Sequence, residues 1–174
     1  MVANAMKHVE NLEKYDFEMI KISLKSSDVL TTIEAYEKIS EKTDYPLHVG
    51  ITEAGTLKSG LIKSSIGIGA ILLKGIGDTI RVSLTAQPKE EVFAAYELLK
   101  SLKLRNRGVN LISCPTCGRT KINLIELAHK VEEIVAPINK PLTIAVMGCP
   151  VNGPGEAKGP NLRIACGQGA GKNI

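Results

Sequence analysis

The order of apolar and polar residues in the first half of the chain predicts strands that alternate with helices. From Met19 to Lys25 apolar and polar residues alternate, which is the period of a strand. Asp28 then stands at the N-cap position of a helix. Further strands are expected at 47–51 and 79–84, followed by helices over 56–74 and from Pro88. In the last of these helices one face is formed by Val92, Ala95, Tyr96 and Leu99. Three such units in series predict an α/β fold with parallel strands and right-handed crossovers.

The second half of the chain uses one layout twice, a strand that leads directly into a loop with a Cys-Pro pair. A strand at 109–112 precedes the sequence CPTCG, and a strand at 142–147 precedes the sequence GCPVNGPGE. The spacing of apolar residues predicts a helix over 123–135 between them. One more strand is expected at 162–166, and the glycine-rich run 167–171 is expected to be a frayed end.

One face of the first predicted sheet carries basic and hydroxyl side chains. These are Lys21, Ser23, Lys25, Arg81 and Ser83. A solvated edge strand would explain any one of the lysines taken alone. However, Lys25, Glu53 and Ser83 lie at or just beyond the C-terminal ends of three successive strands, where α/β proteins bind their ligands. The pattern therefore predicts a phosphate or diphosphate site, with Glu53 as the candidate proton donor or base.

Composition and charge narrow the class of protein. The chain has 174 residues, of which 44% are hydrophobic and 23% charged, and this excludes a disordered protein. With 22 basic and 18 acidic residues and only 3% aromatic residues, the chain is expected to bind small anions locally and not nucleic acid. The sequence contains no apolar run of a length that spans a membrane and no signal-peptide pattern, so the cytoplasm is the predicted compartment.

The four cysteines all lie in the second half, at Cys114, Cys117, Cys149 and Cys166. In a reducing compartment such cysteines are metal ligands or reactive thiols more often than disulfides. The pair Cys114 and Cys117 suits zinc or an iron–sulfur centre, because one turn supplies both sulfurs. Cys166 lies too far from Cys149 to form a second such pair, and its apolar neighbours favour a core position. An iron–sulfur cluster, zinc and redox thiols all stay open on the residues alone.

Four segments of the chain match the motifs of a known enzyme family in their order. They are 51–55 (ITEAG), 75–83 (GIGDTIRVS), 114–117 (CPTC) and 148–157 (GCPVNGPGEA). In these segments, which extend over nearly the whole chain, the sequence resembles 4-hydroxy-3-methylbut-2-enyl diphosphate synthase. The resemblance implies an oxidoreductase of the non-mevalonate pathway of isoprene biosynthesis. Its reaction is the reductive ring opening and dehydration of 2-C-methyl-D-erythritol 2,4-cyclodiphosphate to the linear 4-hydroxy-3-methylbut-2-enyl diphosphate.

The same resemblance implies a role for individual residues. The ligands of a [4Fe-4S] cluster would be Cys114, Cys117, Cys149 and Glu156. An oxygen ligand such as Glu156 binds iron weakly enough to be exchanged for a substrate oxygen. The residues that bind the diphosphate substrate would be Lys25, Arg81, Ser83 and Asn152, with Glu53 as the catalytic proton donor. Cys166 has no role in this set.

The resemblance also implies a domain arrangement and partners. Residues 1–107 correspond to the last three βα units of a TIM-type barrel, and residues 108–174 to part of a ferredoxin-like α+β iron–sulfur domain. We therefore expect a fragment that is incomplete at both ends and inactive alone. Ferredoxin or flavodoxin would donate electrons, and the full enzyme would be a homodimer. Two alternatives are a separate electron-transfer module and a zinc-binding interaction domain, neither of which explains the placement of Glu53, Arg81 and Ser83.

Overall fold

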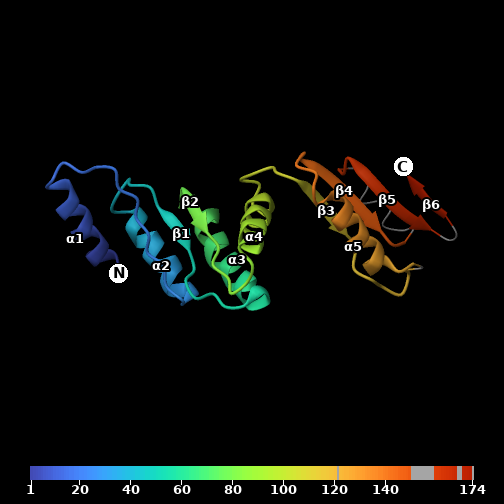
Figure 1. Ribbon diagram of the computed structural model, residues 1–174, viewed down its shortest axis with the longest axis horizontal. Coiled ribbons are helices and arrows are strands. Elements are labelled where there is room, and N and C mark those ends of the chain that lie inside the picture. The colour runs from blue at the N-terminus through green and yellow to red at the C-terminus, as the bar shows by residue number, and fades with distance from the viewer. Residues whose placement is uncertain (121, 150–158, 168–169, 174) are drawn as a thin grey trace. The chain divides into compact units, whose positions relative to one another are not determined.

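The chain forms two compact units, Met1–Arg105 and Asn106–Ile174 (Figure 1). The structure is a computed structural model that describes residues 1–120, 122–149, 159–167 and 170–173. Within these ranges no helix has the length and apolar character needed to cross a bilayer. The assignment of a substrate-binding barrel part to 1–107 and a cluster domain to 108–174 stays a prediction.

The first unit alternates helices with short parallel strands. Its elements are α1 (Val2–Glu13), α2 (Val29–Ser40), β1 (His48–Gly50), α3 (Leu57–Leu73), β2 (Thr79–Arg81) and α4 (Pro88–Ser101). As predicted, β1 and β2 lie side by side and pair in parallel, with Val49 opposite Ile80 (Figure 1). The predicted helix start at Asp28 is confirmed, because its carboxylate accepts the N–H of Thr31 at 2.7 Å.

The strand predicted from Met19 to Lys25 is reduced to a single parallel bridge between Ile22 and Leu47. The reason lies in a buried hydroxyl group. In a continuous parallel ladder the next bond would join the N–H of Leu24 to the carbonyl of His48. Instead, the N–H of Leu24 donates to the hydroxyl of Tyr36 at 3.0 Å, and this hydroxyl donates to the carbonyl of His48. The Tyr36 side chain thus replaces one ladder bond and still holds the two segments together.

The apolar face of this small sheet forms the core of the first unit. Ile22, Leu24, Val49 and Val82 are all buried and belong to one cluster with apolar residues of the helices. The helix residues in that cluster include Tyr36, Ile39, Ile68, Ile71 and Ala94. Lys21 and Arg81, on the opposite face, are exposed. The predicted alternation of apolar and polar positions is therefore confirmed even where the ladder is interrupted.

The second unit contains one helix and a four-stranded sheet in its described part. Its elements are β3 (Val109–Ser113), α5 (Leu124–Val135), β4 (Leu142–Met147), β5 (Leu162–Gly167) and β6 (Ala170–Asn173). The strand order is β3-β4-β5-β6; β3, β4 and β5 are parallel, and β6 is antiparallel to β5. Leu124 and Val131 of α5 form a core with Ile144 and Val146 of β4.

Two expectations for the second unit need correction. The run 167–171 is not a frayed end in its described part, because Ala170–Asn173 pairs with β5 and so satisfies backbone groups of an otherwise open edge. The ferredoxin-like α+β arrangement is not seen among the described strands. Since α5 connects β3 to β4, its immediate parallel neighbour, this part of the unit is an α/β arrangement.

Candidate functional site

The polar face of the first unit brings Lys25 and Arg81 together over a glycine. Gly50 lies opposite Arg81 in the parallel register of β1 and β2. A Cβ atom on Gly50 would lie 2.6 Å from the carbonyl oxygen of Arg81 and 3.0 Å from Cε of Lys25. Only glycine leaves room for such a close approach. We call the surface formed by Lys21, Ser23, Lys25, His48, Thr79 and Arg81 the cationic face.

His48 belongs to this face, although the sequence analysis did not select it. Its ring nitrogen Nδ1 lies 2.8 Å from Oγ1 of Thr79 on the neighbouring strand. Its carbonyl accepts a hydrogen bond from the Ser23 hydroxyl at 3.1 Å. The signal that could have found it is the same alternation, since His48 and Gly50 flank the fully buried Val49.

The charges on the cationic face act on one another. Partial burial, together with the nearby charges of Arg81 and Lys21, lowers the pKa of Lys25 below its ordinary value. Partial burial, followed by the charges of Lys25, Lys21 and Arg81, also lowers the pKa of His48. Both shifts are expected where positive charges accumulate without a neutralising anion. A phosphate group would relieve this repulsion.

Glu53 and Ser83 lie in the segments that follow β1 and β2. Glu53 is exposed and has a φ of +52°, which is uncommon for a residue other than glycine. Ser83 is half-buried, and the N–H of Thr85 donates to the carbonyl of Gly55 at 2.9 Å, which joins the two segments. Within the described residues no hydrogen bond or ion pair connects Glu53 to Lys25 or Arg81. Glu53 and Arg81 lie near the same end of their strands, because Glu53 follows β1 and Arg81 is the last residue of β2.

In the second unit the ends of two neighbouring strands position Cys114 and Cys149. Cys114 directly follows β3 and Cys149 lies two residues beyond β4, and these strands are parallel with Ser113 opposite Val146. The N–H of Cys114 donates to the carbonyl of Val146 at 3.4 Å. The N–H of Gly148 lies 3.5 Å from the sulfur of Cys114. The parallel pairing of β3 and β4 thus brings Cys114 and Cys149 to the same end of the sheet.

Cys117 differs from Cys149 in exposure and environment. Cys149 is only 1% exposed, whereas Cys117 is exposed. The backbone and side-chain N–H groups of Arg119, together with the hydroxyl of Thr120, hydrogen-bond the Cys117 sulfur and lower the pKa of its thiol. Such donors stabilise a thiolate, which is the form that binds metals.

Asn152 and Glu156 lie outside the described residues. Across the described ranges no three side chains of His, Cys, Asp or Glu converge as a metal site would require. Cys166 lies in β5, opposite Gly171 of β6. Of the four ligands that the resemblance implies, only Cys114, Cys117 and Cys149 therefore lie within the described residues.

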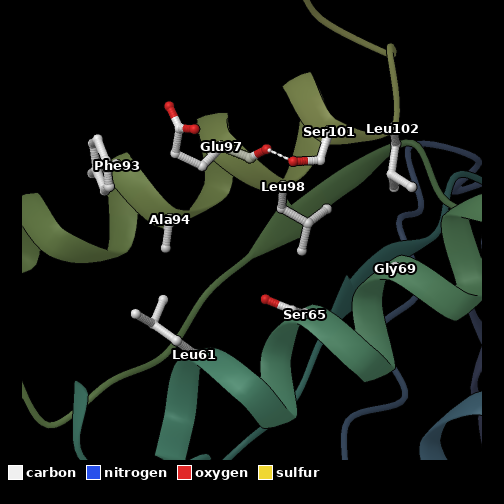
Figure 2. Close-up of a pocket in the computed structure, with 9 residues that line it drawn as sticks. All are labelled: Leu61, Ser65, Gly69, Phe93, Ala94, Glu97, Leu98, Ser101 and Leu102. Carbon is white, nitrogen blue, oxygen red and sulfur yellow. Dashed lines mark hydrogen bonds between the residues drawn. The ribbon is translucent and has the colours of Figure 1, made fainter. Parts of the chain in front are cut away.

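A pocket of the first unit lies away from all of these residues, between α3 and α4 (Figure 2). Its volume is about 330 Å³. Leu61 of α3 and Ala94 and Leu98 of α4 point into it, while the Ser101 hydroxyl donates to the carbonyl of Glu97 at 2.8 Å (Figure 2). Its lining is mostly apolar and includes none of the predicted site residues, so it is not part of the candidate site.

Comparison with known proteins matches both halves of the chain. Residues 1–96 match the GcpE TIM-barrel domain, and residues 110–174 match the GcpE protein C-terminal domain. Over 171 residues the chain is 61% identical to a 4-hydroxy-3-methylbut-2-en-1-yl diphosphate synthase (flavodoxin) of Dehalococcoides mccartyi, an alignment that covers 98% of this chain and 49% of the relative.

Two further relatives carry the same name. They come from Desulfotalea psychrophila, at 57% identity, and Geobacter sulfurreducens, at 56% identity, and each alignment covers 98% of this chain. The matched region is 47% and 48% of these two proteins, so the chain spans about half the length of the curated relatives it matches. The resemblance expected from the four motifs is confirmed, and the chain belongs to the GcpE family.

Proposed function

We propose that this chain supplies part of the active site for the reductive ring opening and dehydration of 2-C-methyl-D-erythritol 2,4-cyclodiphosphate. The observation that carries the proposal is the cationic face, where Gly50 leaves room for the Lys25 side chain beside the main-chain carbonyl of Arg81, at the carboxyl end of parallel strands. A cyclic diphosphate carries negative charge on both phosphates and would be attracted there. The relatives are named as synthases of 4-hydroxy-3-methylbut-2-en-1-yl diphosphate, which supports the choice of product.

Cys114, Cys117 and Cys149, with Glu156, would hold a [4Fe-4S] cluster, which when bound supplies electrons one at a time. Two features of the described loops suit this group. The N–H of Gly148 donates a hydrogen bond to the sulfur of Cys114. N–H groups of Arg119 donate hydrogen bonds to the sulfur of Cys117. Hydrogen bonds of this kind stabilise thiolates and tune a bound cluster. Three thiolate donors also suit zinc less well when the fourth ligand is a carboxylate, because structural zinc sites use sulfur and imidazole nitrogen.

The residues of the first unit would bind and orient the substrate. Lys25, Arg81 and Ser83 would hold phosphate oxygens, and Asn152 would hydrogen-bond the substrate. The ring carbon–oxygen bond would open with its oxygen kept by the diphosphate, while Glu53 would donate a proton to the hydroxyl group on the neighbouring carbon, which leaves as water. The step consumes two electrons and this one proton. A carboxyl group near the carboxyl ends of parallel strands suits this role, since substrate and acid then meet at the same edge.

The partners follow from the same chemistry. Flavodoxin, which the names of the relatives include, or ferredoxin would supply single electrons. In the full enzyme a homodimer would let the cluster of one subunit reach the substrate of the other. We place the protein in the cytoplasm and expect neither nucleic acid nor a membrane as a partner.

The experiment that tests the proposal is anaerobic reconstitution of the 174-residue chain, followed by iron, sulfide and zinc analysis. We expect about four irons and four sulfides per chain, with absorbance that bleaches on reduction by dithionite. Cys114→Ser, Cys117→Ser and Cys149→Ser should each lose most of this iron. Cys166→Ser is the matched control and should retain it.

Two results would contradict the proposal. One zinc without sulfide would indicate a zinc-binding interaction domain instead. Full iron incorporation in the Cys149→Ser variant, with loss in Cys166→Ser, would show that the ligand set is wrong.

A further inference from the structure

The cationic face contains one group that titrates near neutral pH, and the sequence motifs did not assign it a role. This group is the imidazole of His48, one of three histidines in the chain. The other two, His8 on α1 and His129 on α5, are exposed and lie on other elements. Histidine is the side chain whose charge changes most readily between about pH 5 and 8.

The surroundings of His48 fix its position and leave one ring nitrogen available. Its carbonyl accepts hydrogen bonds from the hydroxyls of Tyr36 and Ser23. Its Nδ1 is hydrogen-bonded to Oγ1 of Thr79. No residue in the described ranges hydrogen-bonds its Nε2. A ring held through one nitrogen presents the other to a ligand in a defined direction.

The charged groups around His48 are mostly positive. Lys21 and Lys25 come from the segment before α2, and Arg81 comes from β2. The carboxylate of Asp78, beside Thr79, accepts the N–H of Leu47 at 2.8 Å. The three cations oppose protonation of the ring, and an anion bound among them would reverse this effect.

We propose that His48 is an additional anion-binding residue of the cationic face, and that it takes up a proton from solvent when a phosphate-like dianion binds beside Lys25 and Arg81. The proposal deepens the proposed function, because it assumes that this face binds the phosphates of the substrate. Thr79 fixes the ring, and Nε2 donates to an anion oxygen. Because the bound state holds one more proton, anion affinity rises as the pH falls through the range in which the ring titrates.

Sulfate is a suitable probe because it keeps two negative charges throughout the range in which histidine titrates. We would follow the ring signals of all three histidines by NMR in the isotopically labelled full chain, with and without sulfate, from about pH 5 to 8.5. Sulfate should raise the pKa of His48, whereas His8 and His129 report the nonspecific effect of salt. Sulfate should also bind several-fold more tightly near pH 5.5 than near pH 8.

Two variants refine the test. His48→Gln keeps a hydrogen-bond donor but cannot titrate, so sulfate binding should lose most of its pH dependence. Lys25→Met should weaken sulfate binding at both pH values. Since the main measurement uses the unaltered chain, it does not depend on the folding of either variant.

The outcomes separate this inference from the proposed function. If sulfate shifts the NMR signals of Lys25 and Arg81 but leaves the His48 pKa unchanged, the inference is overturned. The proposal that the cationic face binds anions is then still supported. If sulfate shifts His8 and His129 as much as His48, the effect is nonspecific and the inference is also overturned. If no residue of the cationic face responds to sulfate, both the inference about His48 and the proposed binding of substrate phosphates at this face fail. The iron analysis tests separately whether the chain binds a cluster.

Discussion

Each unit of the chain has its own sheet, and the candidate functional residues lie at different places relative to that sheet. In the first unit Lys25, His48 and Arg81 lie on one sheet face, where their backbone positions are fixed by pairing and by the buried Tyr36. In the second unit Cys114 and Cys149 lie in loops just beyond the strand ends. A strand face depends on a hydrophobic core beneath it, whereas loop ligands can be held by the group they bind. We infer from this comparison that the first unit is preorganised and that the second depends more on the proposed cluster.

The sizes of the two hydrophobic cores also indicate that the first unit is the more preorganised. The first core combines strand residues with buried residues of α2, α3 and α4, whereas the core of the second unit has α5 as its single helix in the described part. The sequence offers a convenient way to measure them separately. All four tyrosines, Tyr15, Tyr36, Tyr45 and Tyr96, lie in the first unit. Tyrosine fluorescence therefore reports the unfolding of the first unit alone.

The largest expected effect comes from the core of the first unit. Ile71 is 0% exposed, so Ile71→Ala should lower the free energy of unfolding of this unit by about 2–5 kcal/mol. Leu73→Ala in the same helix is the control; Leu73 is 74% exposed, and its loss should change stability by less than about 0.5 kcal/mol. Urea unfolding followed by tyrosine fluorescence measures both. Equal destabilisation of the second unit, measured by amide exchange, would show that the two units do not unfold independently.

Removal of the proposed cluster should destabilise the second unit and leave the first unit unchanged. We expect iron chelation to lower the stability of the second unit by about 2.7–4.1 kcal/mol, the amount that a ligand present at 100 to 1,000 times its Kd contributes. Amide exchange of β3, β4 and α5 would become faster, while tyrosine fluorescence of the first unit would stay the same. If chelation leaves exchange in the second unit unchanged, its loops are preorganised and the contrast between the units is lost.

The sequence predicted most of the fold because apolar residues recur at the regular spacing of strands and of helices. The strand predicted at 142–147 has the observed bounds of β4, Leu142–Met147, and the N-cap at Asp28 was also predicted correctly. Alternation placed Lys25 and Arg81 on one polar face. It could not show that the Lys25 side chain lies over Gly50 beside the main-chain carbonyl of Arg81, because these residues are distant in sequence.

Other features required tertiary information. The hydroxyl of Tyr36 interrupts the ladder between Leu24 and His48, and no local pattern predicts such an insertion. Helical periodicity placed Val92 on a common apolar face, but Val92 is 57% exposed and Ala94 is 8% exposed, because the core contacts a different side of α4. The cysteine motifs were recognised from spacing, whereas their convergence depends on loop conformation that spacing does not determine.

An intermediate effect is expected from the hydroxyl that replaces the ladder bond. Tyr36→Phe leaves the N–H of Leu24 without its partner in a buried position and should destabilise the first unit by about 1–3 kcal/mol. Tyr45→Phe is the matched control, since its hydroxyl donates to Glu13 at 3.0 Å at an exposed position and should contribute less than about 0.5 kcal/mol. Urea unfolding followed by the remaining tyrosines compares the two variants. Equal stability of both would mean that the strand pairs stay aligned without this hydroxyl.

The smallest effect concerns the pH dependence of the cationic face. The pKa of His48 lies below its ordinary value of 6.5, so the folded chain binds fewer protons than the unfolded chain between the two values. The stability of the first unit should therefore fall as the pH drops below about 6.5 and level off below the folded pKa. Because the ring is only partly buried, solvent should keep this change well under about 1 kcal/mol.

Lys25→Met tests the cause of this pH dependence. Removing one of the three neighbouring cations should raise the pKa of His48 and reduce the loss of stability at acidic pH, whereas Lys63→Met on the exposed side of α3 should change neither. NMR titration of the ring and the pH dependence of the Tm measure the two quantities. An unchanged His48 pKa would show that Lys25 and His48 do not share one electrostatic field. The first unit would then offer separate charged groups instead of a preorganised anion site, and its contrast with the cysteine loops would disappear.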